Sequence, residues 1–155
     1  MISRIREHGR RISSVGASPA PVVSGPATKV ILYLEDNDDD SVLLRHALRS
    51  AGLPCRLEVI TTATAGRAFL AAYPLKAPDL IICDLGLAGS CGLDFVDWVR
   101  KQPHLKHVPV VLVTGSLPPV QRERASLLAV DACIEKSVDW HELTRQVQRL
   151  LHPRP

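Results

Sequence analysis

The stretch PDLIICDLGLAGSCG, residues 78–92, decides the fold. Its apolar run, Leu80 to Cys83, lies between Pro78 and a glycine-rich loop. A short unbroken run of this kind predicts a strand that is buried on both faces of a sheet. Asp84 ends this strand, and open α/β sheets bind their ligands at the carboxyl ends of strands. Asp84 is therefore predicted to lie in a ligand site, where a partner offsets the cost of its charge at the edge of the core.

The segments on either side of this stretch alternate between strand and helix patterns. The predicted strands are residues 29–34, 55–60, 79–84, 108–113 and 131–135, and the predicted helices are residues 41–52, 62–73, 92–102, 119–128 and 138–151. Strands that alternate with helices through short connections predict a parallel sheet with helices on both faces. The expected fold is a doubly wound α/β domain with a five-stranded parallel sheet.

The composition indicates one globular domain preceded by a basic extension. The chain has 155 residues, 46% of them hydrophobic, which suits one core of ordinary size. Residues 1–28 carry four Arg against one Glu and are rich in Ser, Pro, Ala and Gly, which predicts a disordered extension before a domain at residues 29–152. Residues 29–155 carry 15 basic and 15 acidic residues, so the domain offers no electrostatic case for binding nucleic acid.

The sequence also carries expectations about location. No apolar run approaches the roughly 18 residues of a membrane span, and the first residues lack the apolar segment of a secretory signal. We therefore expect a cytoplasmic protein that does not bind membranes. The cysteines show no CxxC spacing and are expected to be reduced thiols; they are Cys55, Cys83, Cys91 and Cys133.

Polar residues follow four of the five predicted strands, and the carboxyl ends of parallel strands meet at one edge of a sheet. These residues are Glu35 and Asp36 after the first strand, Asp84 after the third, Thr114 after the fourth and Lys136 after the fifth. Three neighbouring carboxylates favour a cation, and Mg²⁺ is the hard ion that takes one or two carboxylates and keeps its waters, with the backbone carbonyl of Gly86 as a further candidate ligand. A hydroxyl and an ammonium opposite a carboxylate suit phosphoryl transfer to that carboxylate. Residues 38–40, all Asp, are interpreted as charges that stabilise the start of a helix.

The order of these residues resembles the response-regulator receiver domain of two-component signalling. The resemblance covers residues 29–152 and rests on the motifs VILYLEDNDDD, PDLIICDLGLAGSCGLDF, VPVVLVTGS and CIEKSVDW. The chain is similar to the stand-alone receivers that partner bacteriophytochrome-type kinases. The resemblance implies the flavodoxin-like (βα)5 receiver fold.

The resemblance also implies a role for each site residue. Asp84 matches the phosphoacceptor, which binds Mg²⁺ together with Glu35, Asp36 and the backbone carbonyl of Gly86. Thr114 and Lys136 match the hydroxyl and the ammonium that bind the phosphoryl group. These matches imply a regulator that is not an enzyme: a sensor histidine kinase phosphorylates it, and it signals to a downstream protein through the last two helices and the last strand. Homodimerisation through that face is a further hypothesis.

Two departures from the family pattern leave an alternative open. Cys133 stands where the family has an aromatic residue that changes its packing with Thr114, so it marks a variant switch position. Ser137 replaces a cis proline after Lys136, and because a cis bond before other residues costs about 2.5–4 kcal/mol, we predict a trans bond. These departures favour a pseudo-receiver, a docking module that is never phosphorylated, whereas the complete set of chemical residues opposes it. A phosphohydrolase is weaker still, because Gly86 occupies the position of its general acid.

Overall fold

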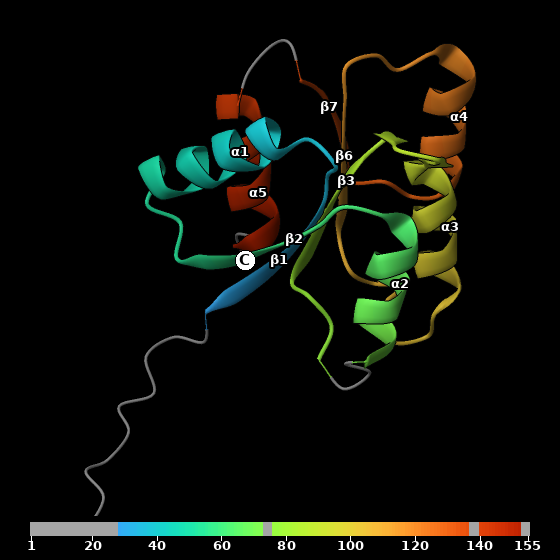
Figure 1. Cartoon of the computed structure of the whole chain (residues 1–155), viewed down its shortest axis with the longest axis horizontal. Helices are drawn as coiled ribbons and strands as arrows, with labels where there is room; N and C mark the ends of the chain where they lie inside the picture. The colour runs from blue at the N-terminus through green and yellow to red at the C-terminus, as the bar shows by residue number, and fades with distance from the viewer. Residues whose placement is uncertain (1–27, 73–75, 137–139, 153–155) are drawn as a thin grey trace, which may run out of the picture.

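The computed structural model describes residues 28–72, 76–136 and 140–152 (Figure 1). Apart from Thr28, the extension expected at residues 1–28 lies outside the described residues. The bond between Lys136 and Ser137, expected to be trans, lies outside them as well. None of the helices in the described ranges combines the length and the apolar character that crossing a bilayer requires.

Five parallel strands form one sheet in the order β2-β1-β3-β6-β7. The strands are β1 (Lys29–Leu34), β2 (Cys55–Ile60), β3 (Leu80–Asp84), β6 (Val110–Thr114) and β7 (Ala132–Glu135). This order is that of flavodoxin-like doubly wound folds, which confirms the predicted fold class. A short antiparallel pair follows β3 and is formed by β4 (Gly86–Leu87) and β5 (Ser90–Cys91). The sequence pattern does not predict this pair, because two-residue strands carry no periodicity.

Five helices cover the two faces of this sheet. They are α1 (Asp38–Ser50), α2 (Ala63–Ala72), α3 (Gly92–Lys101), α4 (Pro119–Leu127) and α5 (Trp140–Leu151). Helices α1 and α5 lie on one face, and α2, α3 and α4 lie on the other (Figure 1). Helix α1 begins three residues before its predicted start, because the Asn37 side chain caps it by accepting hydrogen bonds from the N–H groups of Asp39 and Asp40.

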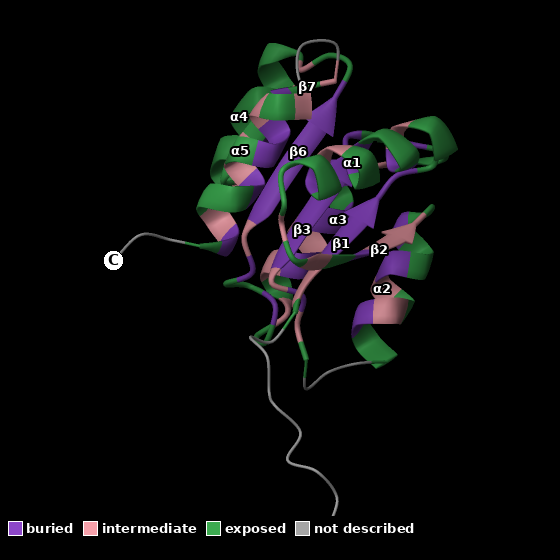
Figure 2. Cartoon of the chain, turned by 90° about the vertical axis from the view of Figure 1, so that its left-hand side faces the viewer, coloured by how far each residue is buried: buried purple, intermediate pink, exposed green. Residues whose placement is uncertain are grey.

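The core consists of two layers, one on each face of the sheet, and strands β3 and β6 are buried throughout (Figure 2). Successive strand residues point to opposite faces. In β1, Ile31 and Tyr33 pack in the cluster that contains the buried residues of α1 and α5, whereas Leu32 and Leu34 pack in the cluster of α2, α3 and α4. The same alternation places Asp84 on the face of α1 and α5, in line with Leu80 and Ile82 of β3.

The chain reverses its winding direction between β1 and β3, since β2 lies on one side of β1 and the later strands lie on the other. Such a switch point opens a crevice at the carboxyl ends of the strands. The two strands at this switch end at Leu34 and Asp84, and β7 ends one residue before Lys136. The fold therefore brings together the polar residues that the sequence analysis placed after separate strands.

Candidate functional site

The ammonium group of Lys136 lies at the centre of the polar residues at this edge of the sheet. Its Nζ atom donates hydrogen bonds to Glu35 Oε2 at 2.6 Å, Asp40 Oδ2 at 2.7 Å and Asp84 Oδ2 at 2.8 Å. The backbone N–H of Lys136 also donates to the carbonyl of Thr114, which fixes the residue to the end of β6. Burial lowers the pKa of this ammonium, but the hydrogen bonds to the carboxylates outweigh burial and raise the pKa above its ordinary value. Lys136 is thus a fixed positive charge.

Glu35 is a buried carboxylate held by three donors. Besides Lys136, the Tyr33 hydroxyl donates to Oε2 at 2.8 Å and the Asn37 N–H donates to Oε1 at 2.9 Å. Burial raises the pKa of Glu35, and these hydrogen bonds oppose the rise without cancelling it. Burial, followed by the charge of Glu35, raises the pKa of Tyr33 too, so its hydroxyl stays a donor. The side chain of Glu35 therefore has little freedom to move.

Asp84 ends β3 beside a closely packed loop. Its Oδ1 atom accepts a hydrogen bond from the N–H of Gly86 at 3.0 Å, while Oδ2 accepts from Lys136. The loop returns so close that a side chain at Gly92 would overlap the backbone oxygen of Asp84. The thiol of Cys83 is fully buried on the opposite face of the sheet, and burial raises its pKa. Asp84 therefore presents its two oxygens in fixed directions.

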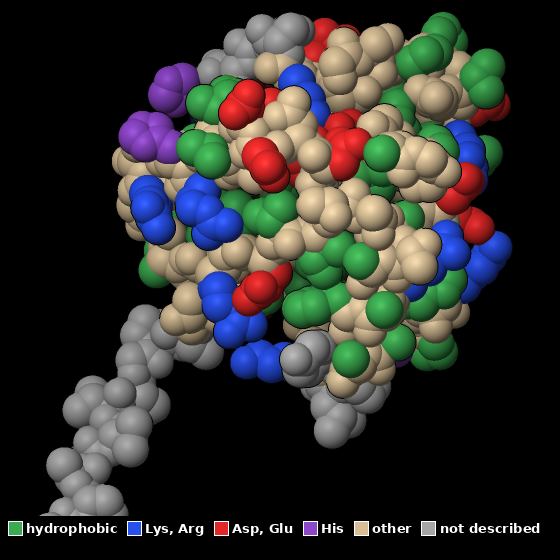
Figure 3. Space-filling view, in the orientation of Figure 1, with side chains coloured by type: hydrophobic (Ala, Val, Ile, Leu, Met, Phe, Trp, Pro, Cys, Tyr) green, Lys and Arg blue, Asp and Glu red, His purple; other side chains and the backbone are tan. Residues whose placement is uncertain are grey.

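The acidic residues of the site form a group that fits a small divalent cation. Glu35, Asp36 and Asp84 each offer a carboxylate oxygen, and these oxygens lie within 4.8 Å of one another. Asp36 is exposed, and its Oδ2 accepts a hydrogen bond from the N–H of Ala88 at 3.0 Å, which ties it to the loop after β3. Oxygen ligands from a few carboxylates, with room for water on an exposed side, are what Mg²⁺ and Mn²⁺ bind. Figure 3 shows Asp and Glu side chains gathered around the first turn of α1.

Thr114 and Cys133 lie farther along the edge of the sheet. The Thr114 hydroxyl donates to the carbonyl of Ser116 at 2.7 Å and accepts from the Ser116 N–H at 3.2 Å, so it is bound within its own loop. Cys133, on β7, is an exposed free thiol. It lines a cavity of about 190 Å³ together with Thr114 and Arg122.

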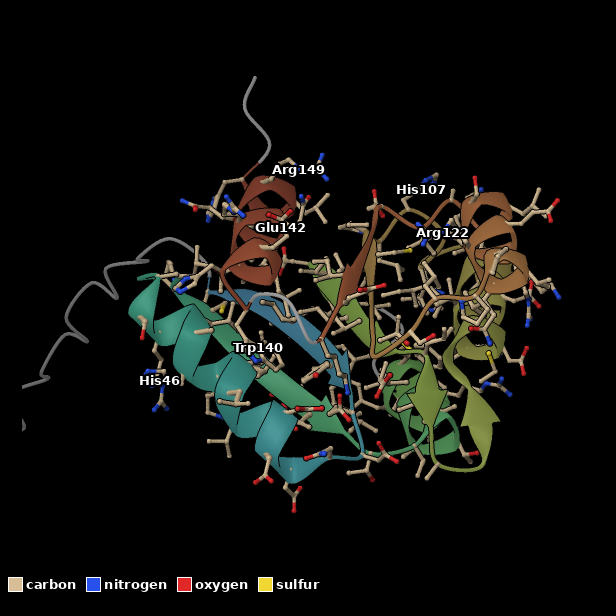
Figure 4. The ribbon with its side chains drawn as sticks, turned by 90° about the horizontal axis from the view of Figure 1, so that it is seen from above. His46, His107, Arg122, Trp140, Glu142 and Arg149 are labelled. Carbon is tan, nitrogen blue, oxygen red and sulfur yellow. The ribbon has the colours of Figure 1, made fainter. Side chains whose placement is uncertain are left out.

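Two residues of the site escaped the sequence analysis. Asp40 was interpreted only as a charge at the helix start, yet its side chain binds Lys136. Tyr33 was assigned to the strand core, yet its hydroxyl binds Glu35. Strand alternation carries a signal for Tyr33, because residues two apart in an extended strand share a face. Within the described part of the chain, by contrast, no histidine belongs to a group that could hold a metal ion. His46 lies on α1, and His107 lies far from it, toward α4 (Figure 4).

A sequence model of the response regulator receiver domain matches residues 31–148. The chain belongs to this family. Receiver domains of response regulators are regulatory proteins and not enzymes, so family membership confirms the expectation of a non-enzymatic protein and removes the phosphohydrolase alternative.

Individual proteins that are similar to this receiver are also response regulators. Response regulator Rcp1 of Synechocystis sp. is 30% identical over 124 residues, which are 77% of this chain and 84% of Rcp1. The polar-differentiation response regulator DivK of Brucella ovis is 31% identical over 114 residues, 72% of this chain and 86% of DivK.

Two solved structures of cyanobacterial-type regulators share the fold of this receiver. The phosphorylated cyanobacterial phytochrome response regulator RcpA has a TM-score of 0.72 at 25% identity, over 81% of this chain and 94% of RcpA. The Mn²⁺-bound form of response regulator Rcp1 has a TM-score of 0.72 at 26% identity, over 82% of this chain and 97% of Rcp1.

Proposed function

We propose that Asp84 accepts a phosphoryl group from a histidine kinase and that the receiver, residues 29–152, passes the signal on through protein contacts. One observation carries the proposal: the partly buried ammonium of Lys136 donates to Asp84 Oδ2 at 2.8 Å, beside the carboxylates of Glu35 and Asp36. A carboxylate beside a fixed positive charge can accept a negatively charged phosphoryl group at low electrostatic cost. A cytoplasmic location, expected from the sequence, is part of this proposal.

The proposed step is a nucleophilic substitution at phosphorus. An oxygen of Asp84 attacks the phosphoryl group of a phosphohistidine on the kinase; the O–P bond forms as the N–P bond breaks, and the histidine nitrogen keeps the electron pair. Lys136 is already in place to bind one phosphoryl oxygen. Thr114 binds another when its hydroxyl exchanges the Ser116 carbonyl for the phosphoryl group. Each of these residues acts from the end of a core strand.

Mg²⁺ is the proposed metal of this site. Glu35, Asp36 and Asp84 would hold it, with the backbone carbonyl of Gly86, a residue whose N–H donates to the Asp84 carboxylate. When bound, the ion supplies positive charge that stabilises the transferred phosphoryl group. The Mn²⁺-bound form of Rcp1 supports a divalent ion in a protein of the same fold.

The relatives also favour one type of kinase partner. Rcp1 and the phytochrome response regulator RcpA both resemble this chain over more than three quarters of its length. We therefore assign the kinase to the phytochrome type. A pull-down with the cognate kinase and a phosphotransfer assay from the phosphorylated kinase test this assignment, which is separate from the proposed role of Asp84.

The face formed by α4, β7 and α5 is the proposed binding surface for the protein that receives the signal. Helix α4 exposes two large apolar side chains, Val120 at 77% and Leu127 at 81%. Cys133, which lines a cavity beside α4 with Arg122, is the proposed variant switch position. A downstream protein or a second copy of the chain is the proposed occupant, and light scattering over a range of concentrations distinguishes them, because only self-association raises the mass of the pure protein.

Incubation with acetyl phosphate and Mg²⁺, followed by intact mass measurement, tests the phosphoacceptor proposal. We expect the wild type to gain one phosphate mass and Asp84→Asn to gain none. A folded wild type that gains nothing would favour the pseudo-receiver, the docking module that is never phosphorylated.

A further inference from the structure

The carboxylate of Asp40 differs from the other two acceptors of Lys136. Glu35 and Asp84 belong to the group of oxygens that fits a divalent cation, and Asp40 does not. Asp40 nevertheless accepts from Lys136 Nζ at 2.7 Å, and the two side chains are only 21% and 18% exposed. This ion pair joins the first turn of α1 to the end of β7, 96 residues later in the chain.

A cation in the acidic group competes with Lys136. Both draw on the carboxylates of Glu35 and Asp84, and a divalent ion repels a nearby ammonium. An ammonium offers only donors and needs acceptors when it is half-buried. Of the three carboxylates that accept hydrogen bonds from Lys136, that of Asp40 is then the one that the cation does not bind.

The position of Asp40 is fixed by the backbone of α1. The Asn37 side chain accepts from the Asp40 N–H at 3.3 Å, and the N–H of Ser41 donates to the Asn37 carbonyl. Helix α1 in turn packs against the sheet through the buried residues Leu44 and Leu48. The carboxylate therefore stays beside Lys136 without needing a flexible loop to hold it.

We propose that Asp40 is a positioning residue that keeps the Lys136 ammonium at the site when the acidic group binds a divalent cation. The retained ammonium is then available to the phosphoryl group, and this second part rests on the proposed function of Asp84. The chain provides a matched control in Asp39, an adjacent acid in the same helical turn. Its carboxylate makes no hydrogen bond or ion pair within the described part of the chain.

Amine-selective acetylation with peptide mass mapping tests the anchoring without any phosphorylation. The labelling rate of Lys136 is measured with and without saturating Mg²⁺ in the wild type, Asp40→Asn, Asp40→Glu and Asp39→Asn. The exposed Lys101, paired with Asp97 on α3, serves as the internal reference for reagent activity. Circular dichroism and thermal unfolding confirm that each variant is folded.

We expect Lys136 to stay protected in every variant without Mg²⁺, because Glu35 and Asp84 still bind it. With Mg²⁺, Lys136 of Asp40→Asn should react about tenfold faster than that of the wild type, as expected from loss of a hydrogen bond between charged groups. Asp39→Asn should match the wild type, and Asp40→Glu should restore protection. Equal labelling of Asp40→Asn and Asp39→Asn in Mg²⁺ would overturn the anchoring role.

Phosphorylation by acetyl phosphate at saturating Mg²⁺ tests the second part. We expect the rate to fall about tenfold in Asp40→Asn and to stay unchanged in Asp39→Asn. An equal rate in the two variants would overturn the positioning role while leaving the phosphoacceptor proposal intact. A wild type that is never phosphorylated would instead overturn the proposed function, and the labelling result would still decide the anchoring.

Discussion

The backbone oxygen of Asp84 lies against Gly92, so close that any side chain at residue 92 would overlap it. The N–H of Gly92 also donates to the carbonyl of Leu85 at 2.9 Å, which closes the loop after β3. The start of α3 and the site carboxylate are therefore packed as one unit. This packing links the stability of the domain to the shape of the site.

Replacing Gly92 with Ala tests this packing. We expect Gly92→Ala to destabilise the domain by about 1–3 kcal/mol, because the backbone of Asp84 or of α3 must move to admit the methyl group. Urea unfolding measures the change. Gly115→Ala is the control, since nothing lies within 4 Å of a side chain placed there. Equal effects of the two substitutions would contradict the close packing.

A substitution at Ala129 should have the opposite effect and raise the free energy of unfolding. Its φ of 50° lies in the left-handed region, and Arg100 Nη2 donates to its carbonyl at 3.0 Å, which holds it there. We expect Ala129→Gly to stabilise the domain by about 0.5–1 kcal/mol, because glycine adopts this conformation without a steric cost. Ala68→Gly, on an exposed position of α2, should instead destabilise by about 1 kcal/mol. Thermal unfolding of both variants checks the contrast in sign.

Asp79 should contribute a pH-dependent part of the stability. Burial raises the pKa of its carboxyl, but hydrogen bonds from the Val30 N–H at 2.8 Å and from Lys29 at 3.1 Å outweigh this, and the net pKa is lowered. A lowered pKa stabilises the fold above the unfolded pKa of about 3.9, and this contribution is lost as the pH falls through the folded value.

We therefore expect Asp79→Asn to cost about 0.5–1 kcal/mol at pH 6, a value reduced because the side chain is partly exposed. The difference from the wild type should shrink steadily below pH 4. Urea unfolding from pH 3 to pH 6 measures it, and Asp39→Asn provides a comparison without these hydrogen bonds. A difference that grows as the pH falls would contradict the assignment.

Metal binding should stabilise the folded chain. A ligand that binds only the folded state raises the unfolding temperature with its concentration. We expect Mg²⁺ or Mn²⁺ to raise it for the wild type and for Asp39→Asn, but not for Asp36→Asn. Asp36 is the best position for this test because it is exposed, so that its loss should change the metal-free stability little. Thermal scans with added ion and then with EDTA measure the effect; an equal rise in all three proteins would refute the site.

The sequence predicted that Glu35, Asp84 and Lys136 lie close together. This prediction does not depend on the order of the strands, because in any parallel sheet the carboxyl ends lie along one edge. The sequence did not predict the contact between Asp40 and Lys136. That contact depends on the residue at which α1 begins and on the orientation of α1 relative to the sheet. The hydroxyl of Thr114 was assigned to the phosphoryl group, whereas in this structure it binds the Ser116 carbonyl. Such local hydrogen bonds depend on the geometry of the loop, which hydrophobic patterns do not predict.

Asp84 is the proposed phosphoacceptor. To test this, the wild type is phosphorylated with acetyl phosphate and Mg²⁺, the acyl phosphate is reduced with borohydride, and the peptides are mapped by mass spectrometry. An aspartyl phosphate is reduced to homoserine, so we expect homoserine at residue 84 and at no other position. Homoserine at another acidic residue, or none in a folded protein that binds Mg²⁺, would contradict it.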